Sequence, residues 1–248
     1  EAGLKNILYV HFTMDDNLSL SEEIKARYRS MYTGVFFKRY ILGLWAMAEG
    51  IIYDMFDADK HVQKITDFFR CLKDGGRYVS CDYGTQNATV FLLWNKGNNG
   101  KWYCVREYYY SGRAKGKQKT DGEYADDFEK WLDGVPIRAV IVDPAAASFI
   151  AELGKRGYRV LKADNDVEDG IREVASMLNM GLLVFCDTCI NTIMEFGSYI
   201  WDEKAAQRGE DRPVKENDHA MDAVRYFVYT ILSKRTGRVK NKAKYGFD

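Results

Sequence analysis

Residues 139–143, which read Ala-Val-Ile-Val-Asp, are the stretch that decides the fold. Four consecutive apolar residues without alternation are typical of a strand covered on both faces, as in the parallel part of an α/β sheet. The run ends on a carboxylate, Asp143, and Pro144 follows it. Ligands of α/β sheets usually gather at such strand ends. The stretch therefore predicts a buried parallel strand that presents an acid at the edge of its sheet.

Three further strands are predicted upstream of this run. They cover residues 78–83, 88–94 and 102–110, and turns rich in Gly and Asn separate them. Short separations of this kind indicate an antiparallel meander. The first of these strands carries an acid near its end, Asp82. We therefore expect a sheet that begins with three hairpin-linked antiparallel strands.

Helices and strands alternate after residue 121. The expected elements are helices over 124–132, 146–155, 167–180 and 217–232, with strands over 139–142, 158–161 and 182–185. In the last helix, apolar residues recur at helical spacing from Met221 to Ile231 and give it one buried stripe. The order predicts an α/β fold with a mixed sheet, three antiparallel strands and then parallel strands, flanked by helices on both faces.

The remaining segments are less regular. Residues 1–70 are interpreted as helical and irregular, and Ser19 with Glu22 forms a capping-box pattern ahead of a polar helix. Residues 199–215 are polar and are interpreted as a β-hairpin or a mobile excursion. Residues 234–248 form a basic tail that we expect to be solvated.

Composition excludes several classes of protein. The 248 residues carry 36 basic and 36 acidic side chains, so bulk charge does not draw the chain onto nucleic acid, and any DNA contact must be local. Five cysteines, an odd number, favour reduced thiols in a cytosolic compartment. Cys186 and Cys189 form one CxxC, for which buried thiols are a simpler interpretation than a zinc site. No apolar run approaches the about 20 residues that span a bilayer, and we expect no membrane contact.

Three aspartates occupy positions where carboxylates are unusual. Asp82 and Asp143 stand at strand ends, and Asp222 lies on the rim of the buried stripe of the last helix. His219 precedes Asp222 by three residues and lies on the same side of that helix. Taken singly, each acid could be a turn residue, a strand terminator or an exposed helix residue. Their joint placement favours a common site.

A cluster of carboxylates persists mainly where a cation offsets the repulsion between them. Two carboxylates about 5 Å apart repel each other by roughly 3 kcal/mol at an effective dielectric constant near 20. Hard oxygen ligands with open positions suit Mg²⁺ or Mn²⁺. Two such ions about 4 Å apart can activate a water and stabilise the leaving oxygen of a phosphodiester. The cluster therefore predicts hydrolysis of phosphodiester bonds.

Three local sequences connect the chain to a known family. Tyr78-Val-Ser-Cys-Asp82-Tyr-Gly-Thr, Val140-Ile-Val-Asp143-Pro-Ala and Asn217-Asp-His-Ala-Met-Asp222-Ala-Val-Arg-Tyr226 resemble the three acidic motifs of phage terminase large subunits. The order of elements is similar to that of the ribonuclease H-like fold of many nucleases and recombinases. The resemblance spans the whole chain.

This resemblance implies an active site and a reaction. Asp82, Asp143 and Asp222 would be catalytic and would bind the metals, which we expect to be two ions of Mg²⁺ or Mn²⁺. His219 would be catalytic as well and would assist metal or phosphate contacts. Asp218 is interpreted as a helix N-cap in preference to a supporting acid. The implied activity is endonucleolytic cutting of double-stranded concatemeric viral DNA at the start and end of packaging.

The resemblance also implies an organisation and a set of partners. We expect residues 1–72 to be a linker that follows a packaging ATPase domain absent from this sequence, 73–233 to be the nuclease domain, and 234–248 to be the tail. The sequence has no G-x-x-x-x-G-K-[ST] phosphate loop, so this chain cannot be the ATP-driven motor by itself. The implied partners are double-stranded DNA, the ATPase domain, the portal and the small terminase subunit, in the host cytoplasm.

A basic loop supplies candidate DNA contacts. Residues 111–119 contain Arg113, Lys115, Lys117 and Lys119, which would bind phosphates without sequence choice; a solvated charge run is an equally open interpretation. The resemblance further implies that the 199–215 segment is a hairpin that limits access to the metals.

Two other functions stay open at this stage. A junction resolvase or recombinase would share the fold but prefer branched DNA to plain duplex. A docking module would bind the portal or the ATPase domain and have weak or vestigial nuclease activity.

Overall fold

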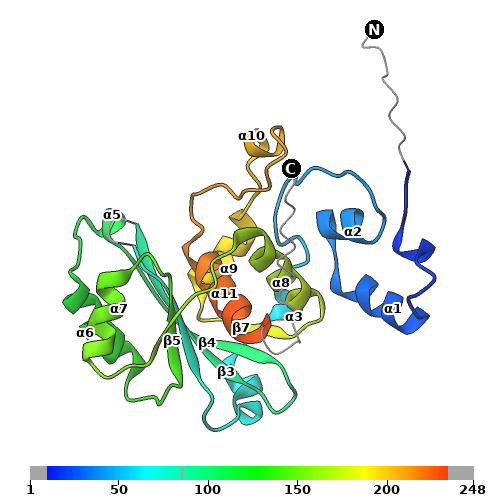
Figure 1. The fold of residues 1–248 in the computed structure, drawn as a ribbon. Coiled ribbons are helices and arrows are strands. Elements are labelled where there is room, and N and C mark those ends of the chain that lie inside the picture. The colour runs from blue at the N-terminus through cyan, green and yellow to red at the C-terminus, as the bar shows by residue number, and fades with distance from the viewer. Residues whose placement is uncertain (1–9, 85–86, 234–248) are drawn as a thin grey trace.

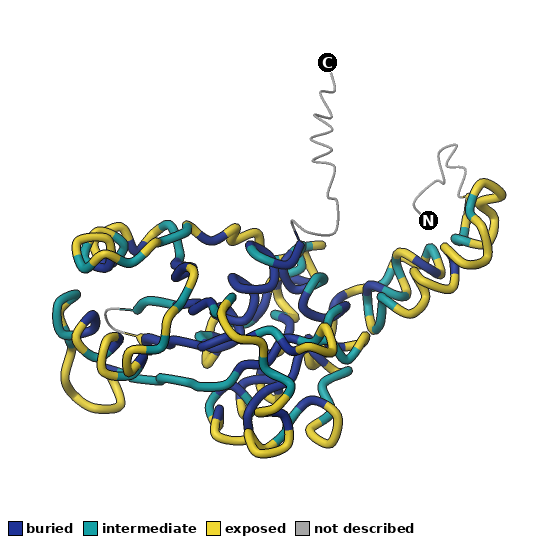
Figure 2. Tube along the Cα trace, turned by 90° about the horizontal axis from the view of Figure 1, so that it is seen from below, coloured by how far each residue is buried: buried dark blue, intermediate teal, exposed yellow. Residues whose placement is uncertain are grey.

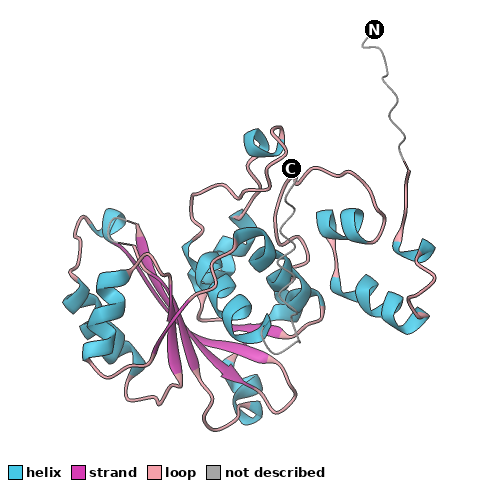
Figure 3. Cartoon of the chain, viewed as in Figure 1, coloured by secondary structure: helices cyan, strands magenta, loops and turns pink. Residues whose placement is uncertain are grey.

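The centre of the molecule is a seven-stranded mixed sheet. The computed structural model describes residues 10–84 and 87–233, so the predicted basic tail lies outside the described residues. The strands are β1 (Val62–Gln63), β2 (Tyr78–Asp82), β3 (Ala88–Lys96), β4 (Trp102–Ser111), β5 (Ala139–Val142), β6 (Val160–Lys162) and β7 (Leu183–Cys186). Their order in the sheet is β1-β7-β4-β3-β2-β5-β6. Figure 3 shows these strands between two groups of helices.

The pairing confirms the predicted mixed α/β fold. The strands β2, β3 and β4 form the antiparallel meander. The apolar run 139–142 is β5, which pairs in parallel with β2 on one side and with β6 on the other. The strand β7 pairs in parallel with β4, and β1 extends the sheet beyond β7. The predicted strand boundaries agree with the observed ones to within about two residues.

Helices cover both faces of the sheet. They are α1 (Glu22–Met31), α2 (Gly34–Tyr40), α3 (Ala58–His61), α4 (Ile65–Phe68), α5 (Gly112–Lys115), α6 (Asp121–Leu132), α7 (Ala147–Lys155), α8 (Val167–Asn179), α9 (Ile190–Ser198), α10 (Glu203–Ala206) and α11 (His219–Phe227), with a π-helical turn over Val228–Leu232. In Figure 1, α6 and α7 lie on one side of the sheet and α8, α9 and α11 on the other.

Each face of the sheet has its own apolar core. Along β5, Ala139 and Ile141 belong to the core shared with α8 and α11, whereas Val140 and Val142 belong to the core shared with α6 and α7. This alternation arises because successive side chains of a strand point to opposite faces. A strand buried on both faces therefore has no polar positions, which is why the sequence of β5 is continuously apolar. Figure 2 shows the buried interior and the more exposed N-terminal helices.

The N-terminal helices α1 and α2 contact the side of the molecule that contains α8 and the 199–215 segment. Helix α1 contacts α8, and Arg39 of α2 pairs with Asp211. The side chain of Tyr53 is fully buried and stacks on Tyr199 at 5.6 Å between ring centroids. The predicted capping box at Ser19 is wrong. Helix α1 begins two residues later, because the hydroxyl of Ser21 accepts the cap hydrogen bond from the backbone of Ile24.

The segment 199–215 is neither a simple hairpin nor irregular. Its two ends pair through an isolated antiparallel bridge between Trp201 and Pro213, and the backbone N–H of Asp202 donates to the carbonyl of Arg212. Between these ends the chain forms the short helix α10, capped by the side chain of Asp202. The two ends therefore pair as in the predicted hairpin, but the segment between them contains the short helix α10.

The sequence did not predict the two-residue strand β1 or helix α9, which follows the CxxC. Cys186 and Cys189 are buried free thiols, and Cys189 Sγ lies 3.8 Å from Cys104 Sγ. Among residues 10–84 and 87–233, no helix has the length and apolar character needed to cross a membrane.

The core beneath α11 provides a first prediction. Phe227 is fully buried and stacks on Trp94 at 4.3 Å between ring centroids. Phe227→Ala should lower the free energy of unfolding by about 3–5 kcal/mol, because it removes the ring and leaves a cavity. Phe69→Ala is the control, since Phe69 is 67% exposed. Urea unfolding followed by tryptophan fluorescence measures both; equal losses would contradict the assigned packing.

Candidate active site

Two of the predicted acids stand at the ends of neighbouring parallel strands. Asp82 is the last residue of β2, and Asp143 directly follows β5. Cys81 lies beside Val142 in the register, so both acids occupy the next position along the sheet. Side chains alternate along a strand, so Asp143 shares the face of Ile141, which belongs to the core beneath α11. Because Asp82 stands beside Asp143 in the parallel register, its side chain lies on that face as well.

The third acid comes from the helix that covers this face. Helix α11 packs across β2 and β3, and Asp222 lies in its first turn with only 8% of its surface exposed. Asp82, Asp143 and Asp222 all line one cleft with a volume of ≈ 420 Å³. Asp218 occupies the predicted N-cap position, but its side chain makes no capping hydrogen bond. The structure therefore gathers acids from three separate segments around one cleft.

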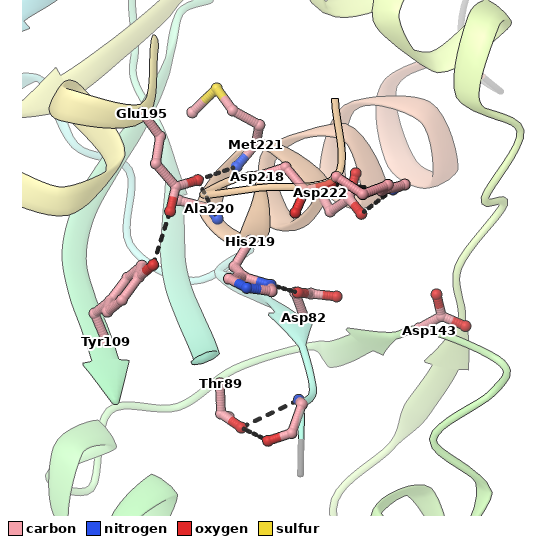
Figure 4. A network of polar contacts seen from close by, with 12 residues as sticks. Asp82, Thr89, Tyr109, Asp143, Glu195, Asp218, His219, Ala220, Met221 and Asp222 are labelled. Carbon is pink, nitrogen blue, oxygen red and sulfur yellow. Dashed lines mark hydrogen bonds and ion pairs between the residues drawn. The ribbon is translucent and has the colours of Figure 1, made fainter. Parts of the chain in front are cut away.

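His219 connects the helix to the end of β2. Its Nδ1 lies 2.9 Å from Oδ2 of Asp82, as Figure 4 shows. Burial raises the pKa of Asp82 to about 6; the contact with His219 opposes this rise, and the charge of Asp222 adds to it. Burial lowers the pKa of His219, but the hydrogen bond and charge of Asp82 outweigh burial, so the net shift is upward. The pair therefore holds a proton more tightly than either group would in water.

Asp143 is held by donors from two directions. The backbone N–H of Ala145 donates to its Oδ1 at 2.7 Å, and the hydroxyl of Tyr226 donates to its Oδ2 at 2.6 Å. Tyr226 belongs to α11, one turn beyond Asp222. Burial raises the pKa of Tyr226, so its hydroxyl stays protonated and remains a donor. Helix α11 thus contacts both strand ends.

Asp222 lies between two basic side chains. Nη2 of Arg225 donates to its Oδ1 at 2.7 Å, and Nζ of Lys215 lies 3.4 Å from its Oδ2. The side chain of Arg225 is 2% exposed, and its Nη1 donates to the backbone carbonyls of Asn165 and Asp166. The side chain of Lys215 is 62% exposed. Arg225 is therefore a fixed partner of Asp222, whereas Lys215 can leave without unpacking the core.

The charge of the cleft suits a hard cation. Its acidic side chains are Asp82, Asp143, Glu216, Asp218 and Asp222, and its basic ones are Arg113 and Lys215, with His219 as the titratable ring. In the described residues, no group of three or more His, Cys, Asp or Glu side chains is arranged to hold a metal ion. Mg²⁺ keeps several waters and needs only one or two carboxylates, so an acidic open cleft fits it better than a closed cage would.

The ammonium group of Lys215 lies between the carboxylates of Asp218 and Asp222. Its Nζ lies 3.1 Å from Oδ2 of the buried Asp218, in addition to its contact with Asp222. An ammonium group placed between two carboxylates occupies the kind of position that a cation favours. The contact offsets part of the repulsion between the acids in the absence of an ion.

The predicted DNA-binding residues do not share one environment. Arg113 of α5 lines the cleft. Lys117 Nζ lies 3.6 Å from Glu123, and Lys119 is paired with Asp127. Lys115 ends the same short helix as Arg113. Arg113 is consequently the member of this set that lines the cleft with the acids.

Several residues around the acids were not singled out from the sequence. Tyr226 follows Asp222 at helical spacing, a signal that marks it as a neighbour of this acid but does not reveal its contact with Asp143. Glu195 of α9 accepts hydrogen bonds from the backbone at the start of α11. No sequence pattern indicated this contact, because it joins segments that only the fold brings together.

Comparisons with known proteins agree with this geometry. A family model described as "Terminase RNaseH-like domain" matches residues 82–230. The terminase large subunit of Escherichia phage T5 is 26% identical over 240 residues, which are 92% of this chain and 52% of that protein. The large terminase of a thermophilic bacteriophage, solved in complex with ADP, is 57% identical with a TM-score of 0.85, over 92% of this chain and 56% of that one.

A more distant structure shows the same fold. The large terminase nuclease of thermophilic phage G20c, solved with bound magnesium, is 13% identical with a TM-score of 0.54, over 75% of this chain and 98% of that one. The present chain spans about half the length of the T5 protein and of the ADP-bound terminase. The family match covers more than half of the chain and includes Asp82, Asp143 and Asp222. These findings confirm the resemblance seen in the sequence: the chain belongs to the family of terminase ribonuclease H-like domains.

Proposed function

We propose that this chain is a divalent-metal-dependent endonuclease that cuts double-stranded concatemeric DNA during viral packaging. The observation that carries the proposal is the convergence of Asp82, Asp143 and Asp222 on one acidic cleft, delivered by two parallel strand ends and the first turn of α11. Membership of the terminase nuclease family supports a hydrolase acting on nucleic acid. The magnesium in the G20c nuclease supports a divalent ion as the cofactor.

The reaction we propose is in-line hydrolysis of a phosphodiester. Two Mg²⁺ or Mn²⁺ ions, when bound, would supply an activated water and stabilise the charge on the leaving oxygen. A bond forms between the water oxygen and phosphorus, the phosphorus–oxygen ester bond breaks, and a water proton ends on the leaving oxygen. The three aspartates would hold the ions. His219 fixes the orientation of Asp82, Tyr226 that of Asp143, and Arg225 that of Asp222.

The length of the relatives supports our proposal that a further domain is joined to this one. The chain spans about half of the T5 protein and of the terminase that was solved with ADP. We therefore propose that this nuclease acts joined to a packaging ATPase domain, on a portal and with a small terminase subunit. Residues 1–72 would be the connection to that ATPase domain, and 73–233 the nuclease domain.

The acids provide the direct test. Asp82→Asn, Asp143→Asn and Asp222→Asn should each reduce cutting of supercoiled plasmid in Mg²⁺ or Mn²⁺ by about 100-fold or more, because each removes a charge that offsets the ions. Asp133→Asn is the matched control. Asp133 is exposed and has a positive φ of 52°, a conformation that asparagine also adopts readily.

The outcomes separate the alternative functions. Cutting that survives the substitutions at Asp82 and Asp143 would refute the site. Absence of cutting in either metal would favour a docking module. A strong preference for four-way junctions over plain duplex would favour a resolvase.

DNA affinity tests the role of the basic loop. Arg113→Gln in an Asp82→Asn background should weaken binding to a duplex and reduce the slope of log K against log salt by about 0.9, the value expected for one lost phosphate contact. Lys155→Gln is the control, because Lys155 stands at the far end of α7 and loses the same charge. Fluorescence anisotropy at several salt concentrations measures both. Equal slopes in the two variants would remove Arg113 from the proposed DNA contacts.

The proton held by Asp82 and His219 predicts a pH dependence for the metal-free protein. The folded-state pKa of Asp82 is about 6, above its ordinary value of 3.8, so the folded protein binds more protons than the unfolded chain. This contribution to stability is present at low pH and is lost as pH rises through about 6, on the order of 3 kcal/mol in total. The upward shift of the His219 pKa acts in the same direction.

Thermal melting measures this effect. Between pH 5 and pH 8 the melting temperature of the metal-free parent should fall more than that of Asp82→Asn, which lacks the titrating carboxyl. Mn²⁺ should stabilise the parent more at pH 8 than at pH 5, because protons no longer compete with the metal. Parallel pH profiles for the parent and the variant would contradict the assigned proton.

A further inference from the structure

Glu195 is a buried carboxylate outside the three acids. It belongs to α9, and only 4% of its surface is exposed. The hydroxyl of Tyr109 donates to its Oε1 at 3.0 Å, and the backbone N–H groups of Ala220 and Met221 donate to its Oε2 at 2.7 and 3.2 Å. Burying a carboxylate costs free energy unless donors surround it. These three donors, two of them from α11, offset part of that cost, and burial still raises the pKa of Glu195 to about 7.

Glu195 replaces the missing cap of α11. The first backbone N–H groups of a helix have no partner within the helix, and a side chain at the N-cap usually supplies one. The N-cap residue of α11 is Asp218, whose side chain forms no such bond. The side chain of Glu195 takes this role from a different helix, because its Oε2 accepts from the backbone N–H groups of Ala220 and Met221. Figure 4 shows this contact together with the neighbouring His219.

The position of α9 is itself fixed from the sheet. Glu107 of β4 accepts hydrogen bonds from the backbone N–H groups of Asn191 and Thr192 at 3.1 and 2.6 Å, and both residues lie in the first turn of α9. A continuous set of contacts therefore runs from β4 through α9 to the start of α11. The two residues that Glu195 binds on α11, Ala220 and Met221, lie between His219 and Asp222.

We propose that Glu195 is a positioning residue that holds the first turn of α11 so that His219 and Asp222 meet the end of β2. The predicted effect of Glu195 on DNA cutting rests on the proposed nuclease function. The predicted effect of Glu195 on the contact between His219 and Asp82 does not depend on that function.

Two substitutions at Glu195 separate positioning from charge. Glu195→Gln keeps an oxygen for the two backbone donors, and its amide can donate to the hydroxyl of Tyr109. Glu195→Ala leaves the start of α11 without an acceptor.

Glu195→Ala should weaken Mn²⁺ binding, measured by calorimetry, by about 10-fold or more, as for other groups that orient metal ligands. It should lower kcat for plasmid cutting with a smaller change in KM, because the ions are misplaced while the DNA surface is intact. Glu195→Gln should restore most of both.

A stability control is Phe128→Leu. Phe128 is fully buried in the core beneath α6, away from the cleft, so this variant loses stability without touching α11. It should keep the parental kcat and Mn²⁺ affinity below its melting temperature.

Tyr109→Phe removes one hydrogen bond to Glu195. Its Mn²⁺ affinity and kcat should lie between those of the parent and of Glu195→Ala, and this variant can be measured even where the alanine variant folds poorly.

A readout without catalysis tests the contact directly. The chain contains three histidines, so the ring signals of His219 can be assigned in the NMR spectrum of the metal-free protein. Glu195→Ala should shift and broaden these signals, and Glu195→Gln should return them close to the parental values. Unchanged His219 signals and Mn²⁺ affinity in Glu195→Ala would overturn the proposal, as would a glutamine variant as defective as alanine. A parent that cuts no DNA, with His219 signals that still respond to Glu195, would refute the nuclease function and leave the positioning role intact.

Discussion

The parallel pairing of β2 and β5 is the constraint on which the rest of the site depends. Cys81 and Val142 lie side by side in the register, so the next residues, Asp82 and Asp143, leave the sheet together and on the same face. A shift of the register by one residue would turn one acid to the opposite face. The apolar residues of both strands prevent such a shift, because each face packs against its own layer of helices. Core packing therefore sets the geometry of the acids.

Helix α11 converts this pair of strand ends into a site with three acids. Its contacts are distributed along its length: His219 meets Asp82 in the first turn, and Tyr226 meets Asp143 two turns on. Each acid has at least one oxygen held by the protein, which limits its motion and leaves other lone pairs for ligands. Since the same helix is buried against Trp94 through Phe227, its position is fixed by the core as well as by the cleft.

The sequence predicted the parts of the site that depend on local pattern. The run 139–143 identified β5 and its terminal acid, and the spacing of the last helix identified its buried stripe. The pattern did not reveal α9, whose outer face carries the exposed apolar residues Ile190 and Met194 and so lacks a clean polar side. It also misplaced the start of α1, because two nearby serines both suit an N-cap and only the backbone decides between them. The partners of Tyr226 and Glu195 come from distant segments, and one sequence does not record such contacts.

Gly170 illustrates how far the support of the site extends. It lies within α8, where glycine is less favourable than alanine by roughly 1 kcal/mol because the unfolded chain is more flexible. A Cβ at this position would lie 2.6 Å from Cγ and 2.8 Å from Cδ of Arg225, closer than packed carbon atoms approach. The absence of a side chain lets Arg225 lie against α8, reach the carbonyls of Asn165 and Asp166, and hold Asp222. A residue that looks unfavourable for its own helix is thus required by the ion pair that fixes an acid on another helix.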